Sequence, residues 1–281
     1  IQEGAAMNGT LLIAGGNIGA TEQGKKEIFS RFAELCGGKS AKVVLAVCAS
    51  GDPEDSFSAN RELLLEAGVG QVALLPLTEQ PDLVGRNSWT NRADQSLLPV
   101  LEGAGGIWFG GGDQLRTARL LLQADGTDTP VLAVMRRLLD GGGVIGGSSA
   151  GAAIMSRIMI ARGDDEGALT LPLCTDARAW QDHNSEGFSP EPLLISRGLG
   201  FLPHGIVDQH FNRRARLQRL MAAMEASNEA QGFGISEDTA LEVSLPDGTF
   251  RVLGSAYVMH LTRKNGRFTI EKLAAAHSAV Q

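Results

Sequence analysis

The sequence predicts an α/β fold in which a doubly wound, mainly parallel sheet is flanked by helices. Short apolar runs in the first half of the chain are unbroken, as is typical of parallel strands buried on both faces. Between these runs lie segments whose apolar residues recur at helical spacing. This alternation of the two patterns is typical of consecutive βαβ units.

Five runs that end in glycine, proline or small residues are predicted to form the strands. They are residues 10–14, 42–48, 72–77, 106–109 and 143–145. The segments between them are predicted to be helices, at residues 24–35, 58–66, 93–101 and 114–122. The alternating order places helices on both faces of the sheet.

The second half of the chain is less regular. Residues 162–192 are polar and are expected to be a loop or a small insert, and a helix is predicted at about residues 211–226. The turn Pro246-Asp247-Gly248 separates two apolar runs and predicts a C-terminal β-hairpin. Short strands are expected at residues 232–235, 240–244 and 251–261.

Length and composition are those of an ordinary globular protein. The chain has 281 residues, of which 43% are hydrophobic and 20% are charged. Since no repeat, low-complexity tract or linker interrupts it, residues 7–281 are predicted to be a single α/β domain. Residues 1–6 precede Met7, which has the position of a natural start, and they are expected to be an artificial extension.

Charge and cysteine content exclude several classes of protein. A net charge of -7 gives no global attraction to nucleic acid or to anionic membranes. Because no apolar run approaches the roughly 18 to 20 residues of a membrane span, and no basic region precedes an apolar one, a cytoplasmic location is expected. The three cysteines match neither a disulfide framework nor a metal site, and no metal or cofactor is expected.

A nucleophile is predicted at Ser149. Gly147, Ser149 and Gly151 satisfy G-x-S-x-G, the pattern of a serine on a strained strand-to-helix turn. A side chain at either glycine position would collide with adjacent backbone, so small neighbours are required. The amide of Ala150 is then placed to stabilise an oxyanion. Ser148 is the competing serine, and a glycine-rich turn that binds an anion is the competing interpretation.

A serine at such a turn needs an imidazole to take its proton. Of the five histidines, His204 and His210 remain once those in polar, strand-like or terminal segments are set aside. His210 lies at the junction of a strand and a helix, where side chains reach a site. A carboxylate that holds the imidazole tautomer is expected from Glu237 or Asp238, although either is equally suited to be a simple turn residue.

Several arginines follow His210 where the next helix is predicted to begin. Positive charge in a first helical turn opposes the helix macrodipole, so an anionic ligand or a carboxylate partner is expected nearby. Solvated arginines on an exposed face are the alternative. The arginines concerned are Arg213, Arg214, Arg216 and Arg219.

Four segments, taken in their order and separation, resemble those of a known family. They are residues 110–115 (GGGDQL), 148–152 (SSAGA), 208–211 (DQHF) with the arginines that follow, and 234–240 (GISEDTA). The family is that of the serine peptidases that contain the cyanophycinases and the aspartyl dipeptidases. The resemblance runs from about residue 10 to residue 260 and implies a hydrolytic domain with a fold like that of class I glutamine amidotransferases.

The resemblance implies a role for individual residues. Ser149 corresponds to the nucleophile, His210 to the general base and later acid, and Glu237 to the residue that orients the imidazole, which makes a Ser-His-Glu triad. The amides of Gly112 and Ala150 correspond to the oxyanion donors. The residues implied to line the substrate pocket are Gln114, Asp208, Gln209, Arg214, Arg216 and Arg219.

The run of arginines resembles the cyanophycinases more than the dipeptidases. The implied substrate is cyanophycin, a poly-aspartate backbone with an arginine on each β-carboxyl group. Hydrolysis of the backbone from one end, through an acyl-enzyme, would release β-Asp-Arg dipeptides, and a homodimer is implied. In such a pocket Asp208 would accept a guanidinium and the arginines would bind carboxylates, although Asp208 is also placed to cap the following helix.

Two other functions stay open at this point. One is a dipeptidase for small peptides with N-terminal aspartate, which differs in the depth of the groove beyond the pocket. The other is a noncatalytic binding protein on the same scaffold. The presence of Ser149, His210 and Glu237 together argues against the second.

Overall fold

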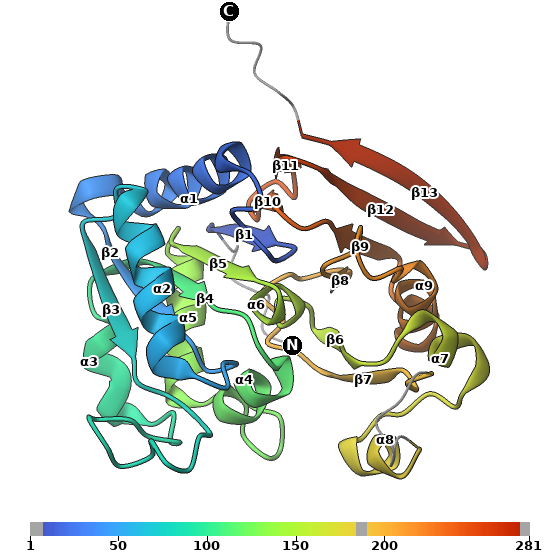
Figure 1. The fold of residues 1–281 in the computed structure, drawn as a ribbon, viewed down its shortest axis with the longest axis horizontal. Coiled ribbons are helices and arrows are strands. Elements are labelled where there is room, and N and C mark those ends of the chain that lie inside the picture. Colours follow the sequence, from blue (N-terminus) through green and yellow to red (C-terminus); the bar gives the residue numbers. More distant parts are fainter. Residues whose placement is uncertain (1–7, 184–189, 276–281) are drawn as a thin grey trace, which may run out of the picture.

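A seven-stranded sheet lies at the centre of the computed structural model, which describes residues 8–183 and 190–275 (Figure 1). Its strand order is β11-β10-β1-β5-β4-β2-β3, and the last five strands run parallel. The prediction of a doubly wound, mainly parallel sheet is therefore confirmed. The parallel strands are β1 (Thr10–Ala14), β5 (Val144–Ser148), β4 (Ala104–Phe109), β2 (Lys42–Ala46) and β3 (Gln71–Leu75).

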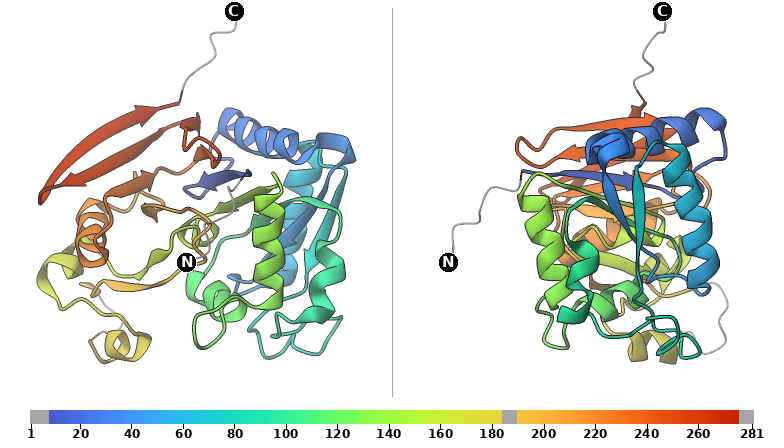
Figure 2. Two further views of the ribbon diagram at one scale, coloured as in Figure 1. Left: turned by 180° about the vertical axis from the view of Figure 1, so that it is seen from behind. Right: turned by 90° about the vertical axis from the view of Figure 1, so that its left-hand side faces the viewer.

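Helices cover both faces of this sheet, as the right-hand view of Figure 2 shows. Successive side chains of β1 belong to different cores: Leu11 and Ile13 pack into one, and Leu12 and Ala14 into the other. The first core includes residues of α4 (Gln114–Leu121) and α5 (Pro130–Asp140), and the second includes residues of α1 (Glu22–Cys36) and α2 (Pro53–Glu66). Burial on both faces is why these strands are apolar without a break.

Helix α5 was not predicted from the sequence, although its start carries two capping signals. Thr129 is the N-cap, and its hydroxyl accepts a hydrogen bond from the amide of Leu132 at 3.3 Å. Pro130 occupies the first turn, where a missing N–H has no consequence. The predicted helix at residues 93–101 is shorter than expected, with a 3₁₀ turn η2 (Gln95–Leu97) followed by α3 (Leu98–Leu101). A further 3₁₀ turn, η1 (Gly38–Ser40), follows α1.

The predicted C-terminal hairpin is present, and it extends the main sheet. Strands β10 (Thr239–Ser244) and β11 (Phe250–Gly254) are antiparallel, and β10 also pairs with β1. The prediction of one strand over residues 251–261 is wrong, because the chain bends at Gly254, whose φ is 96°. After this bend β12 (Tyr257–Lys264) joins a different sheet.

That second sheet has the order β13-β12-β9-β8 and lies beside the main sheet (Figure 1). Its other strands are β13 (Arg267–Ala274), β9 (Gln231–Ile235) and β8 (Ile206–Asp208). Strands β8 and β9 are parallel and end at residues 208 and 235, directly before the two segments that the sequence analysis singled out around His210 and Glu237. Because β8 and β9 are neighbours and run in the same direction, both segments begin at the same edge of this second sheet.

The polar stretch at residues 162–192 contains two short helices, α7 (Asp165–Thr170) and α8 (Ala177–His183), so it is an insert rather than a plain loop. It leaves from β6 (Ile158–Arg162) and returns into the antiparallel partner strand β7 (Leu194–Arg197). Residues 184–189 of this stretch lie outside the described residues, as do the predicted extension at residues 1–6 and the last residues, 276–281. None of the described helices is both long enough and apolar enough to cross a bilayer.

The helix predicted at residues 211–226 begins only at Leu217, as α9 (Leu217–Ser227). His210 and Ala215 both have positive φ, at 49° and 45°, so the backbone between them cannot be helical throughout. The N-cap, Arg216, makes no side-chain cap. Instead, Asp165 of α7 accepts hydrogen bonds from the amides of Gln218 and Arg219 at 3.0 and 2.9 Å. A carboxylate from the insert thus fixes the start of α9.

We expect the substitution Asp165→Ala to lower the free energy of unfolding by about 1 kcal/mol, because two amides at the start of α9 lose their acceptor. The measurement is equilibrium denaturation in urea. Glu166→Ala is the matched control, since it removes an exposed carboxylate from the same turn of α7 without touching α9. Equal stability of the two variants would show that the cap contributes nothing.

Candidate active site

Ser149 lies on a strained turn between β5 and the single helical turn α6 (Ala150–Ala153). Its φ and ψ are 57° and -112°, a conformation that a residue with a side chain rarely adopts. A Cβ at Gly147 would collide with the backbone of Gly151, and a Cβ at Gly151 would collide with the carbonyl of Phe109 in β4. These contacts explain physically why the sequence has glycine on both sides of Ser149.

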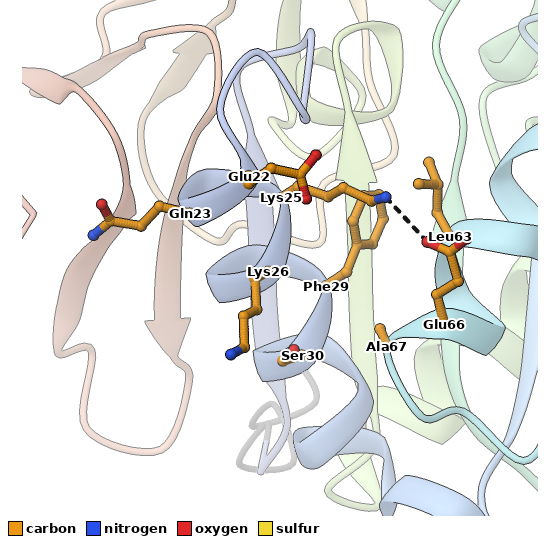
Figure 3. A pocket seen from close by; sticks show the side chains of 9 residues that line it. All are labelled: Glu22, Gln23, Lys25, Lys26, Phe29, Ser30, Leu63, Glu66 and Ala67. Carbon is orange, nitrogen blue, oxygen red and sulfur yellow. Dashed lines mark hydrogen bonds and ion pairs between the residues drawn. The ribbon is translucent and has the colours of Figure 1, made fainter.

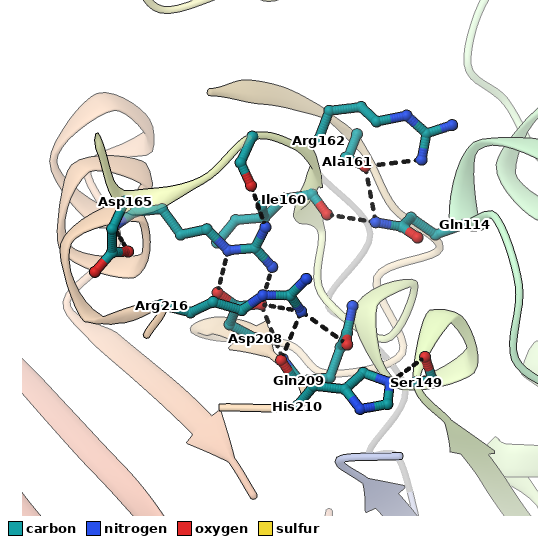
Figure 4. A network of polar contacts seen from close by, with 12 residues as sticks. Gln114, Ser149, Ile160, Ala161, Arg162, Asp165, Asp208, Gln209, His210 and Arg216 are labelled. Carbon is teal, nitrogen blue, oxygen red and sulfur yellow. Dashed lines mark hydrogen bonds and ion pairs between the residues drawn. The ribbon is translucent and has the colours of Figure 1, made fainter. Parts of the chain in front are cut away.

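The structure brings Ser149, His210 and Glu237 together. The hydroxyl Oγ of Ser149 lies 2.9 Å from Nε2 of His210 (Figure 4), and Nδ1 of His210 lies 2.7 Å from Oε1 of Glu237. An ionised carboxylate can only accept hydrogen bonds. The imidazole hydrogen is therefore on Nδ1, which donates a hydrogen bond to Glu237. Nε2 is then free to accept the hydrogen of the Ser149 hydroxyl.

Glu237 and its neighbour Asp238 make different contacts; the residue pattern left both open as the partner of His210, and the resemblance implied Glu237. The buried carboxylate of Asp238 accepts hydrogen bonds from the amide of Gly19 at 2.8 Å and from the hydroxyls of Thr21 and Ser255 at 2.5 and 2.7 Å. It therefore ties the β1–α1 loop to the end of β11. Glu237 is the carboxylate that reaches the imidazole.

The loop after β1 positions both partners of Ser149, and the sequence analysis missed it. The amide of His210 donates to the carbonyl of Gly15 at 2.7 Å, and a Cβ at Gly16 would collide with the imidazole ring. The side-chain amide of Asn17 donates to Oε2 of Glu237 at 2.9 Å. A glycine pair followed by asparagine, directly after the first strand, is the signal that could have revealed this role.

The charges around the imidazole favour its neutral form. Burial lowers the pKa of His210, and the nearby guanidinium groups of Arg214 and Arg216 act in the same direction, against the hydrogen bond to Glu237. The pKa of Glu237 is lowered by the hydrogen bond from Asn17, with further contributions from His210 and Arg213. At neutral pH the site therefore holds a neutral imidazole next to an ionised carboxylate.

A cavity of about 560 Å³ opens beside Ser149. Six of the other residues that the resemblance implied for the site line it: Gly112, Gln114, Gln209, Arg214, Arg216 and Arg219. The remaining lining residues come mainly from the insert and its flanks, and sequence reasoning did not assign them: Ala161, Arg162, Gly163, Trp180 and Glu191. The cavity walls are thus predominantly cationic, in a protein whose net charge is -7.

Asp208 does not line the cavity, because it is buried beneath the arginines. Its carboxylate accepts two hydrogen bonds from Arg219, at 2.7 Å from Nε and 2.5 Å from Nη2. Arg219 also donates to the carbonyl of Gly163. Asp208 does not cap a helix either, since α9 starts at Leu217. The substrate contact expected for Asp208 stays a prediction, and the structure shows it holding Arg219 in place.

Hydrogen bonds to the protein fix the side chains of two further lining residues, Gln114 and Arg216. The amide nitrogen of Gln114 donates to the carbonyls of Ile160 and Ala161 at 3.0 and 2.9 Å, so only its oxygen is left for a ligand (Figure 4). Arg216 donates through Nη1 to the carbonyl and side-chain oxygens of Gln209 at 2.7 and 2.9 Å. Burial lowers the pKa of Arg216 to about 10, so it remains charged at neutral pH.

The amides that the resemblance implies as oxyanion donors belong to a residue that follows Ser149 and to one that lines the same cavity. These residues are Ala150 and Gly112, respectively. Neither amide donates to an acceptor among the hydrogen bonds of residues 8–183 and 190–275. Because α6 is one turn long, these individual N–H groups, rather than a helix macrodipole, are what the site offers to an anion.

A second cavity of similar volume lies between α1 and α2 (Figure 3). Its polar contact is an ion pair of 3.0 Å between Lys25, which is half-buried, and Glu66, which is exposed to solvent. Among the described residues its wall includes Phe29, Leu63 and a serine, Ser30, but no histidine, and no hydrogen bond joins Ser30 to a base. The chemistry of the protein therefore points to the cavity beside Ser149. In the part of the chain that the structure describes, no cluster of three metal-binding side chains occurs.

Fold and geometry together define the class: an α/β protein with a serine on a strand-to-helix turn, hydrogen-bonded to an imidazole. A model of peptidase family S51 matches residues 10–251. This chain belongs to peptidase family S51.

Comparisons with individual proteins agree with this assignment. The cyanophycinase of Synechococcus elongatus is 32% identical over 248 residues, a match that covers 87% of this chain and 66% of that protein. The cyanophycinase of Geminocystis herdmanii is 33% identical over 236 residues, which cover 83% of this chain and 74% of that protein. This chain thus spans slightly less than two thirds of the length of the Synechococcus relative.

A solved structure, that of a peptidase from an acI-B1 actinobacterium, superposes with a TM-score of 0.66. The alignment covers 97% of this chain and 96% of that one at 20% sequence identity. At that identity the likeness concerns the fold, and it supports the mainly parallel α/β architecture. The sequence also led us to expect a fold like that of class I glutamine amidotransferases, and that expectation is likewise for an α/β fold with a mainly parallel sheet.

We expect Glu237→Gln to lower the pKa of His210 further, because a neutral amide no longer stabilises the imidazolium. An NMR titration of the imidazole signals against pH measures this shift. Glu54→Gln, which removes an exposed carboxylate from α2, is the control and is expected to leave the titration unchanged. An unchanged or raised pKa in Glu237→Gln would contradict the assigned hydrogen bond.

Proposed function

We propose that the protein is a serine-type exopeptidase that hydrolyses the poly-aspartate backbone of cyanophycin to β-Asp-Arg dipeptides. The observation that carries the proposal is the hydrogen-bonded series Ser149, His210, Glu237 at the wall of an arginine-lined cavity. The cyanophycinase relatives supply the substrate class. The single domain, the homodimer and the cytoplasmic location expected from the sequence remain predictions.

In the proposed reaction Ser149 attacks the carbonyl carbon of a peptide bond. His210 takes the hydroxyl proton at Nε2 as the bond between Oγ and carbon forms, and Glu237 stabilises the resulting imidazolium through Nδ1–H. The carbonyl oxygen becomes an oxyanion that the amides of Gly112 and Ala150 bind. His210 then protonates the leaving amine, and the peptide bond breaks to give an acyl-enzyme.

Deacylation repeats these steps with water. His210 removes a proton from the water as its oxygen attacks the ester carbon, and then returns that proton to Oγ of Ser149 as the ester bond breaks. The free carboxyl group of the product and the regenerated hydroxyl complete the cycle. In this proposal Arg214 and Arg216, which both line the cavity, bind carboxylates of the polymer.

The first test is incubation with purified cyanophycin and identification of the products by mass. We expect the wild-type protein to release β-Asp-Arg dipeptides and Ser149→Ala to lose on the order of 10⁴-fold or more in rate. Ser148→Ala, the adjacent substitution of the same kind, is expected to keep most of the activity. An intact polymer after incubation with the wild type would remove the proposal, and cleavage of Asp-containing dipeptides alone would favour a dipeptidase instead.

The pH dependence of the reaction provides an independent test. Because the base must be neutral, kcat/KM is expected to fall as the pH drops through the pKa of His210, which lies below its usual value of 6.5. Arg214→Gln removes a nearby positive charge, so the imidazolium becomes less unfavourable and the acid limb is expected to move to higher pH. A limb that stays in place or moves to lower pH in this variant would argue against His210 as the base.

A further inference from the structure

Among the residues that the structure describes, four arginines line the cavity beside Ser149 and one carboxylate does, that of Glu191. Glu191 lies at the end of the insert, just before β7, and its side chain is half-buried. A carboxylate among so many guanidinium groups would be expected to pair with one of them. The hydrogen bonds of the cavity show that this does not happen.

Three of these arginines are bonded to other partners. Arg219 is paired with the buried Asp208, and Arg162 with Asp113, whose Oδ2 lies 2.5 Å from Nη2. Arg216 donates to Gln209. These pairs fix the directions of the guanidinium groups from behind the cavity wall.

The carboxylate of Glu191 has no hydrogen-bond or ion-pair partner among the described residues, although its backbone is held firmly. Its amide donates to Asp164 at 3.1 Å, and its carbonyl accepts from the amide of Asp164 at 3.2 Å. Next to it, Nε1 of Trp180 donates to the carbonyl of Pro192 at 2.9 Å, which fixes the indole on the same wall. The acceptor is therefore positioned but unoccupied by the protein's own cations.

The sequence analysis expected Asp208 to bind the guanidinium of the substrate. In the structure, the carboxylate oxygens of Asp208 are already occupied by hydrogen bonds from the protein. Asp208 is 1% exposed and already accepts two hydrogen bonds from Arg219 and one from the amide of Gln209. An ionised carboxylate in the cavity wall offers two oxygens in the fork geometry that a guanidinium matches. Among the described lining residues, Glu191 is the one that provides it.

We infer that Glu191 binds the guanidinium of the substrate arginine and so determines the preference of the site for a cationic side chain. The inference rests on the proposed function and extends it, because it names the residue that recognises the side chain rather than the backbone. The substrate carries both signs of charge. In this arrangement the arginines of the cavity wall bind its carboxylates, and Glu191 binds its guanidinium.

The test is equilibrium binding, so that it does not depend on turnover. The Ser149→Ala protein is titrated with a synthetic trimer of β-Asp-Arg and with the same trimer carrying citrulline, the neutral isostere of arginine. We expect the arginine trimer to bind about 10-fold tighter or more, as one charge-assisted hydrogen-bonded pair would provide. Adding Glu191→Gln is expected to bring the two affinities to within about twofold of each other, since the difference depends on this one charge.

Glu166→Gln in the same background is the matched control, since it removes an exposed carboxylate from the insert outside the cavity. It is expected to keep the arginine preference. If Glu191→Gln leaves the ratio of affinities unchanged, or weakens both trimers equally, the inference is overturned. Failure of the wild type to cleave cyanophycin would count against the proposed function, whereas the ratio measured with Ser149→Ala decides the role of Glu191 separately.

Discussion

The 2.9 Å hydrogen bond between Ser149 and His210 depends on three chain segments meeting at the carboxyl ends of parallel strands. The segments follow β5, β8 and β1, and each is bent: Ser149, His210 and Gly16 all have positive φ. In Ser149 and His210, which carry side chains, such a conformation costs free energy and persists only where the surroundings over-determine it, whereas Gly16 adopts it readily. Here the carbonyls of Ala14 and Gly15 accept the amides of Ser149 and His210, so the end of β1 holds both partners at once.

The same loop explains why Glu237 and Asp238, adjacent in the chain, serve different ends. Asp238 accepts donors from the loop after β1 and from Ser255, and its amide donates to the carbonyl of Gly16 at 2.9 Å. This anchoring fixes the backbone from which Glu237 reaches the imidazole. Of these two neighbouring carboxylates, Asp238 anchors the turn and Glu237 contacts His210, so loss of the Asp238 anchor is expected to displace Glu237.

The local charge of the cavity is opposite in sign to that of the whole protein. Buried or partly buried carboxylates behind the wall, Asp208 and Asp113, hold Arg219 and Arg162 in place, and Asp165 fixes the start of the helix that carries Arg219. Anchored guanidinium groups present donors to the cavity with little loss of side-chain freedom on binding. Described residues of the insert, Arg162, Gly163, Trp180 and Glu191, form part of the cavity wall, although the sequence of the insert shows only that it is polar.

The amino-acid sequence by itself determined the parallel sheet and the turn at Ser149, because unbroken apolar runs and a glycine-flanked serine are properties of neighbouring residues. It also marked His210 and the two acids at residues 237 and 238 as candidates. The tertiary structure showed what Glu237 and Asp238 each contact, ended the strand at Gly254 and placed Asp208 beneath Arg219. It also left the side chain of Glu191 on the cavity wall without a hydrogen-bond partner among the described residues. Each of these depends on contacts between residues far apart in the chain, and no local pattern encodes which side chain a distant segment will meet.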